Sequence, residues 1–245
     1  LIFFLNLKRK YLISILIFIL MTSTILLSSE RTSTGLMIIY ILAFLVFVPI
    51  KITHKIIFAF MVSLSISIFF YFNDAQRERL INKTLHSINI DNKKYDVILF
   101  SAMHQSHILT SIEMFKDNYF FGKGPKMYRK VCDDINFKKF RVGDHSCTTH
   151  PHNIIAQFLG EVGLVGFIFL IIFYSKIIHV LFKNIFSKNS KDINFPIIML
   201  SFSVLLNFFP FIPYGNFFNN WLSMISYLPI PFLMFIYYDV STNRK

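Results

Sequence analysis

Two histidines and an asparagine stand where a polar segment of the chain becomes hydrophobic, in the run Cys147-Thr148-Thr149-His150-Pro151-His152-Asn153. Asn153 is a favourable N-cap for a helix beginning at Ile154, which puts both imidazoles at the positive end of a helix dipole. That position disfavours the imidazolium form and attracts anions. A neutral imidazole beside an anion site suits a general base that acts on a phosphate-activated substrate. The alternative is that both histidines only fill a membrane interface.

Two polar residues continue this pattern into the hydrophobic segment. Gln157 and Glu161 follow Asn153 at i+4 and i+8 and therefore form one stripe on the predicted helix. Polar groups in such a helix face a cavity or the protein interior rather than lipid. We interpret Asn153, Gln157 and Glu161 as candidate substrate-binding residues. The alternative for Glu161 is that its side chain still lies within the headgroup layer.

A metal site is a second interpretation of the same region. Four zinc ligands could come from Cys147, His150 and His152 together with Cys132 or His145. The spacing is irregular and Pro151 stiffens its middle, so we expect no metal and no cofactor. His104 and His107, spaced by three, are either another ligand pair or the polar face of a helix.

The elements that hold these residues are predicted to be membrane helices. The chain of 245 residues is 54% hydrophobic, contains 31 phenylalanines and has only 16% charged residues, which a soluble domain of this size could not bury in one core. The net charge of +12 comes from basic residues that alternate with long apolar blocks, so we interpret most of them as topological anchors and expect no nucleic-acid partner.

Six stretches approach the roughly 20 apolar residues that a spanning helix needs. They cover residues 11–29, 32–50, 55–72, 158–181, 193–213 and 216–238. Eleven flanking Lys and Arg residues then fall on one side, against Arg31 alone in the short opposite loops. We therefore predict an all-α polytopic membrane protein with spans in 1–72 and 153–245 and a large periplasmic loop over 73–152. Leu1 in place of methionine favours a chain whose N-terminal spans are missing.

The large loop contains recognisable elements. Apolar Ile108, Ile112 and Phe115 predict an amphipathic helix on the surface of the protein or membrane. Phe121-Gly122-Lys123-Gly124-Pro125 predicts a tight turn. Cys132 and Cys147 are the only cysteines, and in an oxidising periplasm we expect a disulfide that closes a loop of about 16 residues and stabilises the fold by roughly 3 kcal/mol.

In this order, these motifs resemble the superfamily of bacterial O-antigen ligases and polymerases. The resemblance rests on the following residues: Ser29-Glu30-Arg31-Thr32 opening a span, the amphipathic helix and its Gly-x-Gly turn, Cys147 to Asn153 followed by Gln157, Glu161, Gly163 and Gly166, and Phe217-Phe218-Asn219-Asn220-Trp221. It runs over nearly all of the chain. Members usually have ten or more spans, which agrees with a truncated N-terminus.

The resemblance implies an inner-membrane enzyme with its active site in the periplasm. It would transfer a glycan from an undecaprenyl pyrophosphate carrier to a sugar hydroxyl of lipid A-core, in lipopolysaccharide biosynthesis, or to another glycan. Arg31 would bind the pyrophosphate, and His152 or His150 would be the essential base. The alternative for Arg31 is an arginine at the end of a span that snorkels to lipid phosphates. His104 occupies the place of a further family arginine, for which Arg141, Lys123 and Lys126 are candidate substitutes.

Two alternatives remain open from the sequence. A polymerase of O-antigen or exopolysaccharide shares these features with a ligase. A transporter of lipid-linked solutes is the alternative from another class, favoured only by Pro210, Pro213, Pro229 and Pro231.

Overall fold

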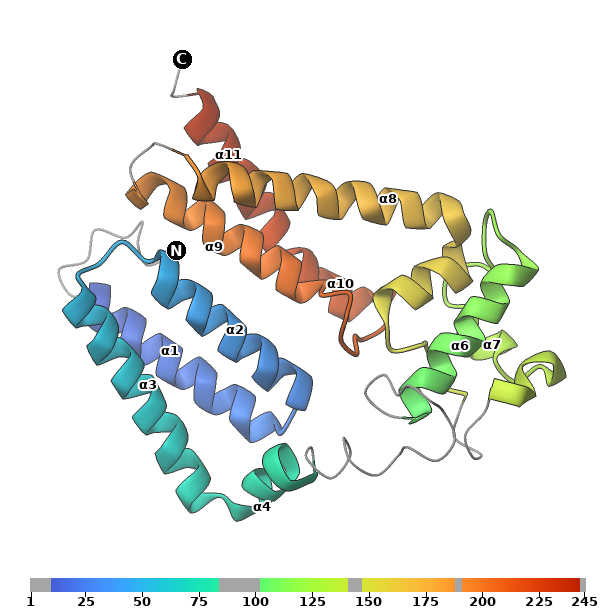
Figure 1. The fold of residues 1–245 in the computed structure, drawn as a ribbon, viewed down its shortest axis with the longest axis horizontal. Coiled ribbons are helices and arrows are strands. Elements are labelled where there is room, and N and C mark those ends of the chain that lie inside the picture. The colour runs from blue at the N-terminus through green and yellow to red at the C-terminus, as the bar shows by residue number, and fades with distance from the viewer. Residues whose placement is uncertain (1–9, 84–101, 141–146, 188–190, 243–245) are drawn as a thin grey trace. The chain divides into compact units, whose positions relative to one another are not determined.

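The computed structural model of the chain describes residues 10–83, 102–140, 147–187 and 191–242. All regular structure within these ranges is helical (Figure 1), which confirms the predicted fold class at this level. The chain forms two compact units, Leu1–His86 and Ser87–Lys245.

The described part of the first unit, residues 10–83, contains three long helices followed by two short helical elements. Its elements are α1 (Lys10–Ser28), α2 (Arg31–Phe47), α3 (Ile52–Phe72), α4 (Asp74–Arg77) and the π-helical turn η2 (Glu78–Asn82). One aromatic from each long helix meets in the centre: the ring of Phe18 lies 4.8 Å from that of Phe44 and 5.1 Å from that of Phe58. These contacts hold the three helices together as an apolar bundle.

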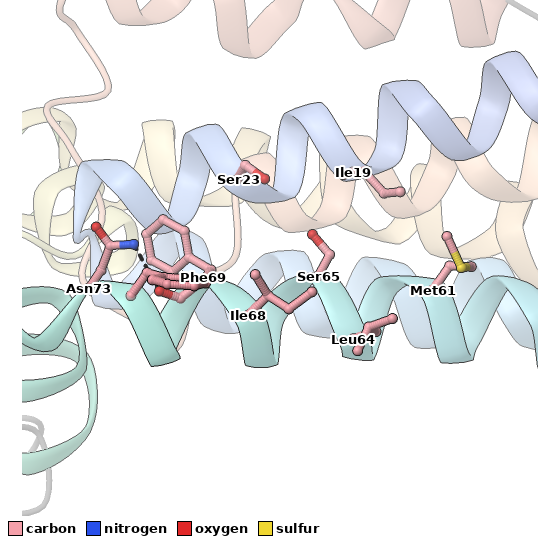
Figure 2. A pocket seen from close by; sticks show the side chains of 9 residues that line it. Ile19, Ser23, Met61, Leu64, Ser65, Ile68, Phe69 and Asn73 are labelled. Atoms are coloured by element: carbon pink, nitrogen blue, oxygen red, sulfur yellow. Dashed lines mark hydrogen bonds between the residues drawn. The ribbon is translucent and has the colours of Figure 1, made fainter.

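A groove of about 410 Å³ lies between α1 and α3. Figure 2 shows apolar side chains along it, with the hydroxyls of Ser23 and Ser65 between them. At one end the side-chain amide of Asn73 donates to the Phe69 carbonyl over 2.8 Å, which satisfies a carbonyl in the last turn of α3.

The second unit carries the histidines named above. Its elements are α6 (Ala102–Asp117), α7 (Tyr128–Val131), the 3₁₀ helix η3 (Ile135–Phe140), α8 (Ile154–Ile185), α9 (Lys191–Asn207), α10 (Asn220–Tyr227) and α11 (Pro229–Thr242). The main core lies between α8, α9 and α11 and includes Leu170, Ile197, Val204 and Leu233. A smaller core of Met114, Tyr128, Cys132 and Phe137 joins α6, α7 and η3.

Three of the helical stretches are long and apolar enough to cross a membrane: Ile52–Phe72, Ile154–Ile185 and Asn220–Val240. Leu16–Ser28, Arg31–Phe47 and Asn194–Asn207 are shorter apolar helices. Every predicted span therefore corresponds to an apolar helix in the described residues, while three of the six have the full length.

Two of the predicted spans have wrong boundaries. The stretch 193–213 is helical only to Asn207, and Pro210 and Pro213, which have no backbone N–H to continue a helix, follow in an irregular segment. The stretch 216–238 begins as a helix only at Asn220, capped by the Asn219 side chain, and is interrupted at Leu228 before Pro229.

Candidate active site

Asn153 begins α8 as the sequence predicts. Its side-chain oxygen accepts a hydrogen bond from the Ala156 N–H over 3.0 Å, and its amide nitrogen donates to the Pro210 carbonyl over 2.8 Å. One residue therefore caps the helix and attaches it to the segment between α9 and α10. This confirms the predicted N-cap and places His152 immediately before it.

His152 has an unusual backbone conformation, with a φ of 54° in the left-handed region. Its carbonyl accepts from the Tyr214 N–H over 2.8 Å, which holds the strained turn. A residue of this kind costs free energy unless its surroundings enforce it, and such residues concentrate at functional sites.

Four imidazoles meet at this turn, two from α6 and two from the start of α8. The ring centroid of His152 lies 4.0 Å from that of His150, 5.4 Å from that of His104 and 5.5 Å from that of His107. We call His104, His107, His150 and His152 the histidine cluster. His152 is its centre, since its ring contacts the other three.

The environment favours the neutral form of three of these imidazoles. Burial lowers the pKa of His152. Burial and then the imidazole of His152 lower the pKa of His104. The pKa of His150 falls to about 4 because of burial and the neighbouring His152 and His104, against the opposing hydrogen bond to Tyr214. Desolvation and mutual repulsion thus act in the direction that the helix dipole alone led us to expect.

The two histidines of the turn differ in what their ring nitrogens contact. Nε2 of His150 lies 3.1 Å from the Tyr214 carbonyl, and since a carbonyl only accepts, Nε2 carries the proton. Nδ1 then accepts from the Thr149 hydroxyl over 2.8 Å. Both nitrogens of His150 are therefore occupied by the protein. Among the described residues no hydrogen bond engages the ring of the half-buried His152, so His152 is the imidazole that remains able to take a proton from a ligand.

Gln157 and Glu161 lie in the protein interior, as predicted, with 1% and 0% of their surface exposed. The Gln157 amide nitrogen donates to Oε2 of Glu161 over 2.9 Å and to the side-chain oxygen of Asn216 over 2.7 Å. Oε1 of Gln157 accepts from the Phe217 N–H over 3.0 Å. The two residues thus tie the first turns of α8 to the segment before α10.

Glu161 also reaches the histidine cluster indirectly. Its Oε1 accepts from the Tyr128 N–H over 2.8 Å. The Tyr128 ring, which is completely buried, lies against the His107 ring with centroids 6.5 Å apart. The buried carboxylate therefore supports one wall of the cluster, and its contacts in the structure are with the protein.

The Gly-x-Gly turn fits into a break in α8. Gly163 has φ 69° and ψ −164°, which interrupts the helix, and Figure 1 shows the short first part of α8 at an angle to the long second part. The N–H groups of Lys123 and Gly124 donate to the carbonyls of Gly160 and Glu161 over 2.9 and 2.8 Å. The freed helix carbonyls are satisfied by the turn, so turn and break form one unit.

The basic residues predicted to bind phosphate have different surroundings. Lys123 pairs with Asp117, Nζ to Oδ2 3.2 Å. Lys126 has a φ of 62° and its Nζ donates to the Asn220 side chain over 3.4 Å. Arg31 is the exposed first residue of α2. Arg141 lies outside the described residues. Arg31 belongs to the first unit and the cluster to the second, so contact between them stays a prediction.

Cys132 and Cys147 are joined by a disulfide, with Cα atoms 5.5 Å apart. Both sulfurs are therefore removed from the metal-ligand set that the sequence left open, and His145 lies outside the described residues. Within the described ranges no three His, Cys, Asp or Glu side chains are arranged to hold one ion.

Sequence reasoning did not assign roles to three residues of this site. His107 had a signal in its spacing of three from His104, but that spacing also fits a solvated helix face. Tyr214 and Asn216 lie in an irregular segment with no periodicity to single them out. Only the fold brings them to His150, His152 and Gln157.

The described helices include three that are long and apolar enough to cross a membrane, and a buried polar cluster lies where one of them, α8, begins. These features are typical of a helical membrane protein. The model of the O-antigen ligase family matches residues 16–171, well over half of the chain. The protein belongs to the O-antigen ligase family, whose members are membrane enzymes of the glycan ligase and polymerase type. No curated protein and no solved structure matches the chain.

Proposed function

We propose that the protein transfers an O-antigen-like glycan from undecaprenyl pyrophosphate to a sugar hydroxyl of lipid A-core, at the periplasmic face of the inner membrane. The observation that carries this proposal is the histidine cluster, in which three imidazoles surround one half-buried His152 just before a helix start. Such an arrangement supplies a general base whose pKa is held below its usual value by burial, so that the imidazole is unprotonated before the reaction.

In the proposed reaction His152 accepts the proton of the acceptor hydroxyl. The hydroxyl oxygen forms a bond to the anomeric carbon while the bond from that carbon to the pyrophosphate oxygen breaks. Attack opposite the leaving group inverts the anomeric configuration. The proton stays on the imidazole until the lipid pyrophosphate has left, and no metal takes part.

His150 and Asn153 have positioning roles in this proposal. The hydrogen bonds of His150 to Thr149 and Tyr214 fix its ring against that of His152. Asn153 fixes the backbone that follows His152. Gln157 and Glu161 hold the surrounding segments from the interior.

The charge that develops on the leaving pyrophosphate requires cationic groups. Arg31 begins α2, where its planar guanidinium combines with the positive end of a helix dipole. Lys123 and Lys126, together with Arg141, are the further cationic groups that we assign to the anion. His104, whose pKa is lowered, is assigned to the anion as a neutral polar neighbour. We assign pyrophosphate binding to Arg31 because of the family resemblance, in which the arginine that opens a span binds the pyrophosphate.

An aromatic groove of about 300 Å³ in the second unit suits the polyprenyl tail. Phe158, the lining residue of α8 that lies nearest the start of that helix, follows Gln157 directly, and the Phe217 N–H donates to Oε1 of Gln157. An apolar chain in this groove would place its head towards the start of α8. The groove is lined by Phe158, Phe169, Leu170, Phe173, Phe208, Phe217, Tyr227 and Ile230.

The test is a transfer assay with purified protein in liposomes, a lipid-linked glycan donor and either lipid A-core or free glycan as acceptor. We expect His152→Ala and Arg31→Ala each to abolish transfer while the protein remains in the membrane. His179→Ala and Arg79→Ala are the matched controls, since both residues are exposed and lie outside the site, and should retain activity.

The same assay separates the alternatives. A polymerase would extend the glycan acceptor and ignore lipid A-core, and a transporter would leave the glycosidic linkage untouched. Transfer that persists in chelator supports the metal-independent step. Wild-type transfer by both His152→Ala and Arg31→Ala would refute the proposed site.

A further inference from the structure

Three consecutive aromatic residues are exposed in the turn that follows α6. Tyr119, Phe120 and Phe121 have 53%, 65% and 70% of their surface accessible. We call them the aromatic turn. Exposed apolar residues that occur singly need no explanation, but three large side chains in succession mark an interaction surface.

The aromatic turn is fixed to α8 at the point where that helix becomes exposed. The N–H groups of Leu164 and Val165 donate to the carbonyls of Tyr119 and Phe120 over 2.7 and 3.2 Å. These bonds satisfy two carbonyls of the turn within the protein. A turn whose carbonyls are satisfied in this way can enter a lipid interface at much lower cost than an open loop.

The apolar side chains of α8 are exposed only after Gly163. Before it, between Ile154 and Gly163, the helix is buried or half-buried in the protein. After it the apolar side chains of Leu164, Val165, Ile168, Phe169, Ile171 and Ile172 are exposed. The surface presented by the aromatic turn is therefore continuous with the apolar surface of a helix able to cross a membrane.

The length of the second part of α8 agrees with this boundary. From Leu164 to Ile185 it contains about 22 residues and is about 33 Å long. A hydrocarbon core is roughly 30 Å thick. The lysines of this stretch, Lys176 and Lys183, both lie in its second half, towards the opposite face.

Basic residues precede and follow the aromatic turn in the sequence. Lys116 and Lys123 flank it, and Lys126, Arg129 and Lys130 follow within the next elements. Aromatic rings at the level of the headgroups with basic groups just outside them are typical of a membrane interface.

We propose that the aromatic turn inserts into the headgroup region of the bilayer and sets the height of the histidine cluster above the membrane. The turn is bonded to the break in α8, and α8 is bonded to α6 through the Ser111 hydroxyl and the Ala156 carbonyl over 2.7 Å. Insertion of the turn therefore holds α6 and its histidines at a constant distance from the lipid. The occupant of this surface is the bilayer interface itself.

The test uses the full chain in liposomes with one tryptophan as reporter. Trp221, the single native tryptophan, is first replaced by phenylalanine. Phe121→Trp and, separately, Phe120→Trp then report on the turn. Asn136→Trp is the matched control, because Asn136 is exposed on η3 of the same unit. Acrylamide quenches from water, and lipids with a spin label near the headgroup or near the chain end quench from the bilayer.

We expect both turn reporters to emit at shorter wavelength than Asn136→Trp, to be quenched most by the shallow lipid label, and to be about threefold less sensitive to acrylamide. Equal acrylamide quenching of the turn and control reporters would overturn the proposal. Protection from all three quenchers would also overturn it, since the turn would then be covered by protein. Stronger quenching by the deep label than by the shallow one would contradict the interfacial depth. None of these outcomes depends on glycan transfer.

Discussion

Gly163→Ala tests whether the break in α8 is required for the fold of the second unit. The native φ of 69° and ψ of −164° lie in a region used almost only by glycine, at a cost of about 1–3 kcal/mol for another residue. A Cβ there would lie 2.5 Å from the carbonyl carbon and oxygen of Phe120. These are backbone atoms, so the turn itself would have to move.

Displacement of the turn would remove the two hydrogen bonds from Leu164 and Val165, each worth about 1 kcal/mol net. We therefore expect a loss of about 3–5 kcal/mol, which corresponds to a decrease of about 6–20 °C in Tm for a unit of this size. The measurement is thermal unfolding in detergent, followed by far-UV circular dichroism.

Two other glycines supply controls for the same chemical change. A methyl group at Gly35, in the middle of α2, meets no atom within 4 Å. At Gly215, in the second unit, it meets only the flexible end of the Leu222 side chain. Both alanine variants should melt close to the wild type. If Gly163→Ala melts within about 2 °C of these controls, the interlocked turn and break do not stabilise the unit as argued.

Three further predictions concern the buried groups. Glu161→Ala should destabilise the protein by about 1–3 kcal/mol, because the Tyr128 N–H and the Gln157 amide lose a buried acceptor. Glu161→Gln should cost less, since its carbonyl oxygen still accepts from the Tyr128 N–H, although its NH₂ group then faces the NH₂ group of Gln157. Equal melting of both variants and the wild type would contradict this. Replacing Cys132 and Cys147 together by serine should lower the free energy of unfolding by about 3 kcal/mol, as expected for a closed loop of this length. Wild-type protein whose disulfide has been reduced should melt at the same temperature as this variant. The pKa values of His104, His150 and His152 are lowered from 6.5, that of His150 to about 4. Between about pH 6.5 and pH 4 the unfolded chain therefore binds more protons than the folded chain. The free energy of unfolding should therefore be highest above about pH 6.5 and fall towards pH 4. The fall should be less steep in His150→Asn, and a Tm that rises on acidification would refute the lowered pKa values.

The sequence by itself determined the class of the protein and the local role of several residues. Apolar blocks between basic anchors require membrane helices, because neither feature depends on which helices pack together. Asn153 was identifiable as a cap because capping involves only the next three residues. The helical spacing of Gln157 and Glu161 in an apolar segment favoured an interior position for both residues. For Glu161 it left a position in the headgroup layer open, and the structure shows that the side chain is buried.

Helix boundaries were less accessible to sequence reasoning. Hydropathy extended one predicted span through Pro210 and Pro213, whereas the helix ends at Asn207. It also missed the break at Gly163, because a glycine inside an apolar run is compatible with a continuous helix. The break becomes favourable only where the turn at 119–124 supplies donors and acceptors for the interrupted backbone.

Only the tertiary structure decided which imidazoles meet. His104 and His152 are far apart in the chain, and their ring centroids lie 5.4 Å apart because Ser111 of α6 bonds to Ala156 of α8. The lowered pKa values follow from this convergence and from burial, neither of which is a property of one segment. Spacing along a chain specifies neighbours within a helix, but contacts between helices depend on packing, and the histidine cluster is such a contact.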